Sequence, residues 1–215
     1  MQNKEVWNEV YLQHGTNVPW AQEQELNQWH QKIISRVLSE RPQARCILDY
    51  GCGYGQIGDY FYQQGYQVEL AELSDVITKQ LAEKYGEKVP VYLVNTPNDI
   101  PNRQNAYDMI LAIGVFHHLM PEDWDIFLKS FHQLLKTDGI LFISGWDDDD
   151  AEISKRNESL FTHLPRSSIN GLKQHIVSSD DYTIVEDSAQ TFYFESQNMN
   201  RKMHYFILNN KEKNK

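Results

Sequence analysis

The segment Cys46–Gly58 constrains the fold more than any other part of the chain. It begins as a short apolar run, reaches an acid at Asp49, and then carries four glycines within eight positions. A helical pattern follows at once, with Ile57 and Phe61 on one face. Glycine tolerates positive φ and lets a ligand approach the backbone closely. The segment therefore predicts a strand, a tight turn and a helix whose first amides point into the cleft above the strand.

The acid before the glycines limits which ligand this turn can bind. Gly53–Gly58 matches the dinucleotide pattern G-x-G-x-x-G, which is a weak signal by itself. A dinucleotide would place its pyrophosphate at the helix N-terminus, where the carboxylate of Asp49 would repel it. A cationic ligand without phosphate suits the turn better. S-adenosylmethionine, which carries an ammonium and a sulfonium group, is such a ligand.

The residues Leu48–Gly55, which read Leu-Asp-Tyr-Gly-Cys-Gly-Tyr-Gly, resemble the first motif of class I S-adenosylmethionine-dependent methyltransferases. The resemblance covers about Leu26–Leu208. It implies an α/β fold, with a Rossmann-like seven-stranded, mostly parallel sheet, helices on both faces and an antiparallel C-terminal edge hairpin. It also implies methyl transfer from S-adenosylmethionine, with S-adenosylhomocysteine as the product. A glycine-rich turn that binds no ligand is the plain alternative.

Glu72 is the next residue that matches the family. It lies 19 positions after Gly53, at the end of the predicted strand Gln67–Glu72. A carboxylate at this place can accept hydrogen bonds from both ribose hydroxyls of a nucleoside. The position resembles the ribose-binding acid of the family, and a solvated strand-end glutamate is the alternative.

The turn after the predicted third strand departs from the family. There the family usually supplies an acid for the adenine amino group and a backbone N–H for the ring. Here Thr96 stands in place of the acid, and Pro97 has no N–H to donate. Asn95 or Asn98 could substitute with a side-chain amide. The residues assigned to the cofactor are Asp49, Gly51, Cys52, Gly53, Glu72, Leu73, Asn95, Thr96 and Ile113.

The predicted fourth strand, Ala106–Ile113, runs into Phe116-His117-His118-Leu119, which looks like the fourth-strand exit of the family. Histidine near neutrality can accept a proton from an amine or a hydroxyl acceptor. Because adjacent side chains diverge in a strand or helix, we expect only one of the pair to face the cleft. We assign the catalytic role to His117, and the equal alternative is that both residues only pack or cap the next helix.

The first forty residues precede the sheet, and in the family such a segment commonly folds over the cofactor cleft. Tyr11 and Trp20 are therefore candidate lid residues, with ordinary packing at the sheet edge as the alternative. Trp146 and Asp147–Asp150 follow the predicted fifth strand. We expect the four aspartates to form a solvated loop, with attraction of an amine substrate or of a divalent ion as alternatives. The residues assigned to the substrate or lid are Tyr11, Trp20, His118 and Trp146.

The remaining pattern predicts further elements and one domain. Residues 1–41 are expected to form an N-terminal helical cover and residues 209–215 a disordered polar tail, within a single domain of residues 1–215. We expect Ser74 to cap a helix and Pro121 to begin another. The other predicted helices are Lys4–Gln13, Leu26–Val37, Ile153–Leu160 and Ser168–Ile176, and the other predicted strands are Val89–Val94, Ile140–Ser144 after a turn at Lys136–Gly139, Tyr182–Glu186 and Lys202–Leu208.

The net charge, the apolar runs and the cysteines of the chain limit which partners and which compartment we expect. The formal net charge of -10 over 215 residues argues against non-specific binding to nucleic acid or to an anionic membrane. No apolar run is long enough to span a bilayer, and the start of the chain is no signal peptide. Cys46 and Cys52 lie too far apart along an extended strand for a disulfide, which favours a reduced, cytoplasmic protein.

Two other classes of function stay open at this point. One is an NAD-dependent oxidoreductase that uses the same glycines, and the other is a non-catalytic relative of the methyltransferases that binds a ligand or partner. The histidines lack zinc-site spacing, so we predict no metal. A small-molecule acceptor is favoured over nucleic acid, with a protein acceptor as the alternative. The sequence names neither the acceptor, nor the atom methylated, nor the oligomeric state.

Overall fold

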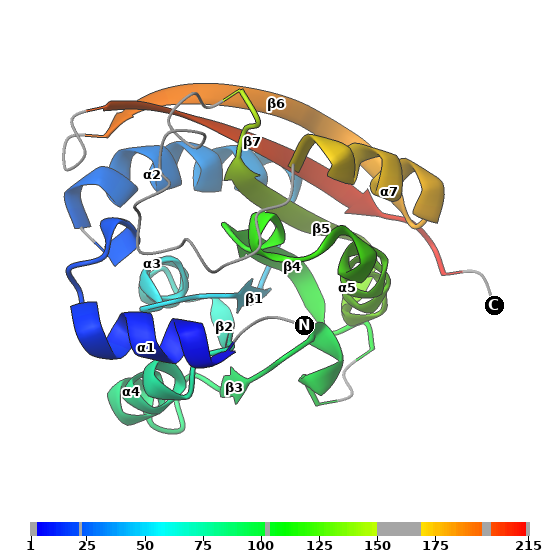
Figure 1. Ribbon diagram of the computed structural model, residues 1–215. Coiled ribbons are helices and arrows are strands. Elements are labelled where there is room, and N and C mark those ends of the chain that lie inside the picture. The colour runs from blue at the N-terminus through cyan, green and yellow to red at the C-terminus, as the bar shows by residue number, and fades with distance from the viewer. Residues whose placement is uncertain (1–3, 22, 102–103, 150–168, 195–198, 214–215) are drawn as a thin grey trace.

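The structure is a computed structural model that describes residues 4–21, 23–101, 104–149, 169–194 and 199–213. Its seven-stranded sheet has the order β3-β2-β1-β4-β5-β7-β6 (Figure 1). The first five strands in this order run parallel, and β7 and β6 are antiparallel to their neighbours. This arrangement confirms the predicted fold class. The strands are β1 (Cys46–Tyr50), β2 (Gln67–Glu72), β3 (Val91–Leu93), β4 (Tyr107–Ile113), β5 (Leu135–Trp146), β6 (Tyr182–Phe194) and β7 (Met199–Asn210).

Helices cover both faces of the sheet (Figure 1). Ser74 caps its helix as predicted, because its side chain accepts the N–H of Ile77. Pro121 begins α5, also as predicted. The helices are α1 (Lys4–His14), α2 (Glu23–Glu40), α3 (Gln56–Gln63), α4 (Asp75–Tyr85), α5 (Pro121–Leu134) and α7 (Leu172–Ser179), and the 3₁₀ turns are η1 (Pro19–Ala21), η2 (Pro97–Asp99), η3 (Phe116–His118) and η4 (Ile169–Gly171).

Alternate residues of each central strand enter two separate cores, as the two-residue period of a strand requires. Ile47 of β1 packs with α2, α3 and α4 on one face, and Leu48 packs with α5 and α7 on the other. Both residues are fully buried. The two cores hold the sheet between layers of helices, and the carboxyl ends of β1, β2, β4 and β5 lie along one edge.

The predicted turn at Lys136–Gly139 is wrong as a strand boundary, because β5 begins earlier, at Leu135. Leu135 pairs with Tyr107 and Ile140 pairs with Met109, so β5 advances five residues while β4 advances two. The extra residues bulge out of the ladder, where Asp138 adopts a φ of 58°. The turn residues are thus a bulge inside a longer strand.

The prediction of a disordered tail at 209–215 is also wrong for its first two residues. β7 continues through Asn210, whose fully buried side chain donates to the carbonyl oxygen of Lys136 at 3.0 Å. The predicted helix Ile153–Leu160 lies outside the described residues. The helix predicted at Ser168–Ile176 begins as η4 and continues as α7.

Candidate functional site

The glycine loop after β1 folds against the exit of β4. Gly51, Gly53 and Gly55 have φ values of 69°, 52° and 73°, which glycine adopts without strain. The Gly51 N–H donates to the carbonyl oxygen of Ala71 at 2.8 Å. A Cβ atom on Gly51 would lie 2.5 Å from Cγ2 of Val115. Gly51 is therefore required for close packing within the protein, whatever it contributes to ligand approach.

Glu72 holds the loop in place with its carboxylate. One oxygen, Oε2, accepts the N–H of Gly53 at 2.8 Å, and Oε1 accepts those of Leu73 at 2.8 Å and Ser74 at 3.0 Å. The side chain is 6% exposed. Burial raises its pKa, and the three backbone N–H groups oppose that shift. A carboxylate has about four acceptor positions. Three N–H groups leave room for one further donor, fewer than the two ribose hydroxyls predicted.

Asp49 lies at the neighbouring strand end. It is 2% exposed, and its Oδ2 accepts the N–H of Gly58 at 2.9 Å, at the start of α3. Burial raises the pKa of this carboxyl to about 7, although the Gly58 N–H opposes the shift. The negative charge of Glu72 adds to it. A cation placed nearby would favour the ionised form of Asp49.

The half-buried Cys52 lies in the loop between these acids, and its thiol pKa is raised by burial and by both carboxylates. Leu73 is buried directly after Glu72. Ile113 is half-buried at the end of β4 and packs into the core that faces α2, α3 and α4.

The N-terminal segment packs onto the glycine loop through Tyr11 and Trp20. A Cβ atom on Gly53 would meet the Tyr11 hydroxyl at 3.5 Å and the Trp20 ring at 3.9 Å. The rings of Tyr11 and Trp20 are 6.4 Å apart, and Trp7 lies 5.8 Å from Trp20. Both residues therefore lie against the loop at Gly53, and their role as a lid stays a prediction.

Hydrogen bonds and an ion pair between polar side chains connect α1 to the start of α4. The Ser74 hydroxyl donates to Oδ1 of Asn8 at 2.6 Å, and Nδ2 of Asn8 donates to Oδ2 of Asp75 at 3.1 Å. Lys4 forms an ion pair with Asp75 at 3.1 Å. Ser74 also donates its N–H to Glu72, the candidate ribose-binding residue. Ser74 therefore connects α1 to Glu72.

The two histidines of η3 differ in their surroundings. The His118 ring meets the Trp7 ring of α1 edge-on at 5.1 Å. His117 is 7% exposed, and a Cβ atom on Gly145 would lie 2.8 Å from its Nδ1. The expected divergence of the pair is wrong, because their ring centroids are 3.9 Å apart. In a 3₁₀ turn neighbouring side chains are about 120° apart and the rings can fold toward each other.

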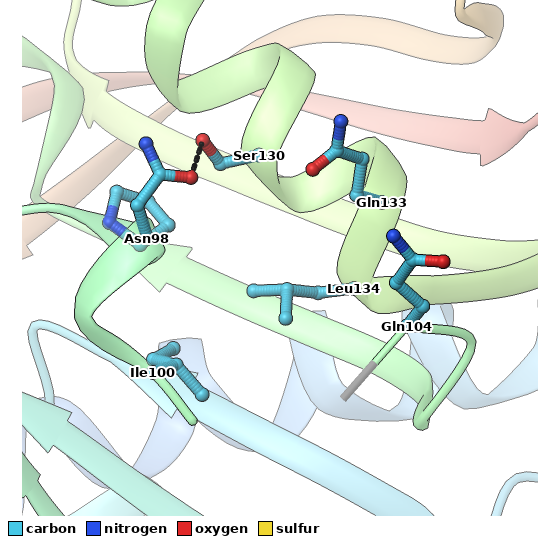
Figure 2. A pocket seen from close by; sticks show the side chains of 7 residues that line it. Asn98, Ile100, Gln104, Ser130, Gln133 and Leu134 are labelled. Atoms are coloured by element: carbon cyan, nitrogen blue, oxygen red, sulfur yellow. Dashed lines mark hydrogen bonds between the residues drawn. The ribbon is translucent and has the colours of Figure 1, made fainter. Parts of the chain in front are cut away.

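Two backbone N–H groups of the turn after β3 bond to a side chain of the same turn. Oδ2 of Asp99 accepts the N–H groups of Asn95 at 2.7 Å and Thr96 at 3.0 Å. The Ser130 hydroxyl donates to Oδ1 of Asn98 at 2.8 Å. This bond lies at a cavity of about 110 Å³ between η2 and α5. Figure 2 shows the side chain of Asn98 turned toward the helix. The cavity is lined by Pro97, Asn98, Ile100, Gln104, Ser130, Gln133 and Leu134.

The segment after β5 differs from the solvated loop that we predicted for Asp147–Asp150, because its first aspartate is buried. Asp147 is 3% exposed and pairs with Lys202 at 3.1 Å and His204 at 3.3 Å, while Asp148 and Asp149 are exposed. Asp150 lies outside the described residues. Trp146 stacks under the Arg201 guanidinium at 3.8 Å. Within the described ranges, no group of three or more His, Cys, Asp or Glu side chains is placed to hold a metal ion.

Sequence reasoning missed the residues that join distant segments. Trp7 contacts His118, and Asn8 binds Ser74, so that these two residues hold α1 in place. Val115 lies against Gly51, and Asp99 accepts the N–H of Asn95 in the turn after β3. For Trp7 the signal was its place with Val6, Val10 and Tyr11 on one side of the predicted helix. No helix in the described part of the chain is long and apolar enough to cross a membrane.

Comparisons with known proteins identify the family and the fold of the chain. A family model described as a methyltransferase domain matches residues 20–185. Cyclopropane-fatty-acyl-phospholipid synthase of Escherichia coli K12 is 25% identical over 182 residues, which are 83% of this chain and 44% of that protein. The chain thus spans less than half the length of this curated relative.

Two solved structures share the fold. One is a Burkholderia thailandensis 1,6-didemethyltoxoflavin-N1-methyltransferase with bound S-adenosylhomocysteine, at a TM-score of 0.68 and 19% identity, covering 97% of this chain and 88% of that one. The other is magnesium protoporphyrin IX methyltransferase of Synechocystis PCC 6803, also with bound S-adenosylhomocysteine. Its TM-score is 0.68 at 14% identity, covering 96% of this chain and 97% of that one.

Proposed function

This chain belongs to the methyltransferase domain family, and on that premise we propose that it transfers a methyl group from S-adenosylmethionine to a small-molecule acceptor. One observation carries the proposal. Two buried acids, Asp49 and Glu72, lie near the carboxyl ends of adjacent parallel strands, where Glu72 accepts the N–H of Gly53 in the glycine loop and Asp49 accepts that of Gly58 in α3. Two solved structures of this fold were obtained with the reaction product S-adenosylhomocysteine bound.

The described residues fit this cofactor. A cationic amino group near Asp49 would stabilise the ionised form of a carboxyl whose pKa is about 7. Glu72 keeps one acceptor position for a ribose hydroxyl. When bound, S-adenosylmethionine supplies an electrophilic methyl group on a sulfonium sulfur. Asp49 and Glu72 hold the polar parts of the cofactor in this proposal.

The chain itself has to orient the acceptor and exclude water. Tyr11 and Trp20 lie over the glycine loop and provide that cover. We assign His117 to accept the proton of an amine or hydroxyl acceptor, or to orient it, and His118 to contact the cover through Trp7.

We also infer the setting of the reaction. The free cysteines Cys46 and Cys52 suit a cytoplasmic protein. The net charge of -10 disfavours nucleic acid as a partner. No resident metal is included in the proposal.

Thermal unfolding with separate additions of S-adenosylmethionine, S-adenosylhomocysteine and NAD tests the cofactor. A ligand at a hundred times its dissociation constant stabilises by about 2.7 kcal/mol. We expect the two adenosyl compounds to raise the melting temperature and NAD to leave it unchanged. Stabilisation by NAD alone would refute the proposal. Binding of both adenosyl compounds without methyl transfer to any acceptor in a metabolite screen would indicate a non-catalytic relative.

A further inference from the structure

The ring of His117 lies against the backbone of two glycines, Gly114 after β4 and Gly145 in β5. A Cβ atom on Gly145 would lie 2.8 Å from Nδ1 of His117 and 3.4 Å from its Cβ. A Cβ atom on Gly114 would lie 3.7 Å from Cε1 of the same ring. The ring edge that carries Nδ1 and Cε1 therefore faces the ends of two strands that pair with each other.

Gly145 leaves the space that His117 occupies. Atoms in favourable contact are roughly 3.5–4.0 Å apart, so a methyl group at 2.8 Å from Nδ1 would displace the ring. The same methyl group would meet Cδ1 of the fully buried Ile169 at 2.9 Å. A Cβ atom on Gly114 would make only an ordinary contact. The position of the ring therefore depends on Gly145 more than on Gly114.

The surroundings of His117 limit where a displaced ring could move. The side chain is 7% exposed, and its ring centroid lies 3.9 Å from that of His118. The ring of His118 in turn meets Trp7 of α1 at 5.1 Å. A ring pushed away from β5 must move against His118 or turn about its own side-chain bonds. Either movement changes the direction in which its nitrogens point.

The contact with β5 also distinguishes the two ring nitrogens. Nδ1 of His117 is shielded from solvent and lies against Gly145. In a neutral imidazole one nitrogen carries the proton and the other can accept one. Because a nitrogen held against a strand cannot reach the methyl acceptor, Nε2 is the nitrogen that can take its proton, and Nδ1 then carries the proton of the neutral ring.

We propose that Gly145 is a positioning residue that, by carrying no side chain, holds His117 with Nδ1 against β5 and makes Nε2 the proton-accepting nitrogen. This inference rests on the proposed function and adds the residue that orients His117 and the atom that acts. As the methyl acceptor forms its bond to the methyl carbon and the bond from that carbon to sulfur breaks, its proton passes to Nε2 and His117 becomes an imidazolium. A side chain at position 145 should lower turnover and leave cofactor binding unchanged.

Two measurements on Gly145→Ala test the proposal. Imidazole 15N NMR at about pH 8, above the ordinary pKa of histidine, distinguishes the N–H nitrogen of a neutral ring from the bare one. The His117 signals are assigned by their loss in His117→Gln. With S-adenosylhomocysteine bound, the wild type should carry this proton on Nδ1, and Gly145→Ala should shift both signals. With an acceptor identified by screening, Gly145→Ala should lower kcat about 10- to 100-fold at unchanged affinity for S-adenosylhomocysteine, as for a base moved by about 1 Å.

Gly171→Ala is the matched control, because a Cβ atom there would lie 3.5 Å from the Trp124 ring, which is an ordinary contact. It should keep the wild-type His117 signals and the wild-type kcat. Gly145→Ala combined with Ile169→Val removes the close contact with Cδ1 of Ile169 and retains the one with His117. This double variant should still show the shifted signals and the lower kcat, and it keeps the test usable if Gly145→Ala alone does not fold.

Three results would overturn the proposal alone. The first is a wild-type ring with its proton on Nε2. The second is a Gly145→Ala protein with wild-type His117 signals or wild-type kcat. The third is recovery of the wild-type kcat in the double variant, since Ile169 would then be the residue that Gly145 accommodates. A wild-type protein that fails to bind S-adenosylhomocysteine would instead refute the proposed function.

Discussion

The two sides of the candidate site are built differently. On the side of β1 and β2, carboxylates bind the main chain: Glu72 accepts three backbone N–H groups and Asp49 accepts one. On the side of β4 and β5, side chains contact side chains from distant segments. His118 meets Trp7 of α1, and Asp147 pairs with Lys202 of β7.

Because of this difference, substitutions on the two sides should change different properties of the protein. A buried carboxylate that satisfies several N–H groups cannot be removed without leaving them unpaired, so the β1–β2 side should respond mainly in folding and cofactor affinity. A side-chain contact can be removed with less damage to the backbone. The β4–β5 side should therefore respond mainly in turnover and in docking of α1.

The largest expected effect is on Glu72. Glu72→Ala leaves three buried N–H groups without their acceptor, and each costs about 1–3 kcal/mol. We expect the free energy of unfolding in urea to fall by about 3–9 kcal/mol, and S-adenosylhomocysteine binding to be lost in calorimetry. Glu69→Ala on the same strand is the control, because Glu69 accepts from the Tyr107 hydroxyl and bonds no N–H of the glycine loop in the described structure. A Glu72→Ala protein as stable as the control would contradict the main-chain role.

The second prediction concerns the pH dependence that Asp49 causes. Its pKa is raised from 3.8 to about 7 in the folded protein. The folded state therefore holds a proton that the unfolded state releases, and the stabilisation, up to about 4 kcal/mol, is complete below the unfolded pKa and lost as pH rises through about 7.

Urea unfolding between pH 4 and 8 tests this sign. The stability of the wild type relative to Asp49→Asn should fall as pH rises, because asparagine does not ionise. Asp138→Asn, at an exposed position with φ of 58° that asparagine tolerates, is the control. A difference that rises with pH would show that the pKa of Asp49 is lower in the folded than in the unfolded protein, opposite to the prediction.

Much of the β1–β2 side could be predicted because its residues are close in the chain and act through the backbone. The strand, the glycine loop, Glu72 and the Ser74 cap follow from periodicity and spacing. The bulge after Leu135 could not be predicted, since its residues are also those of an ordinary turn. The burial of Asp147 depends on Lys202 and His204, more than fifty positions away, which no local pattern reveals.

The third prediction distinguishes the two histidines of η3 on the β4–β5 side. With an acceptor identified by screening, His117→Ala should lower kcat by about 100-fold and keep wild-type affinity for S-adenosylhomocysteine. His118→Ala should keep most of the turnover rate and loosen α1, because its ring contacts Trp7. Steady-state kinetics with melting temperatures for both variants make the comparison. Full turnover in a folded His117→Ala protein would leave His117 a packing residue against Gly145.

The smallest expected effect tests where the two sides meet. Asn8 of α1 binds Ser74 and Asp75, and Ser74 donates its N–H to Glu72. Asn8→Ala removes these side-chain bonds and leaves the glycine loop intact. The bond to Asp75 is exposed and contributes little, and the part-buried bond to Ser74 contributes about 1 kcal/mol. We therefore expect amide exchange in α1 to accelerate about fivefold and S-adenosylhomocysteine to dissociate faster by a similar factor.

Hydrogen exchange with mass spectrometry, with and without S-adenosylhomocysteine, measures this coupling. The wild type should gain protection in Val6–Trp20 when the ligand binds, because a cover that contacts the loop is stabilised with it. Asn8→Ala should gain less. Gln13→Ala is the control, since Gln13 is exposed on α1 and bonds only to Glu9 of the same helix among the side-chain contacts described. Protection confined to Cys46–Glu72 in every variant would show that α1 packs on the site without responding to it, and the two sides would then act independently.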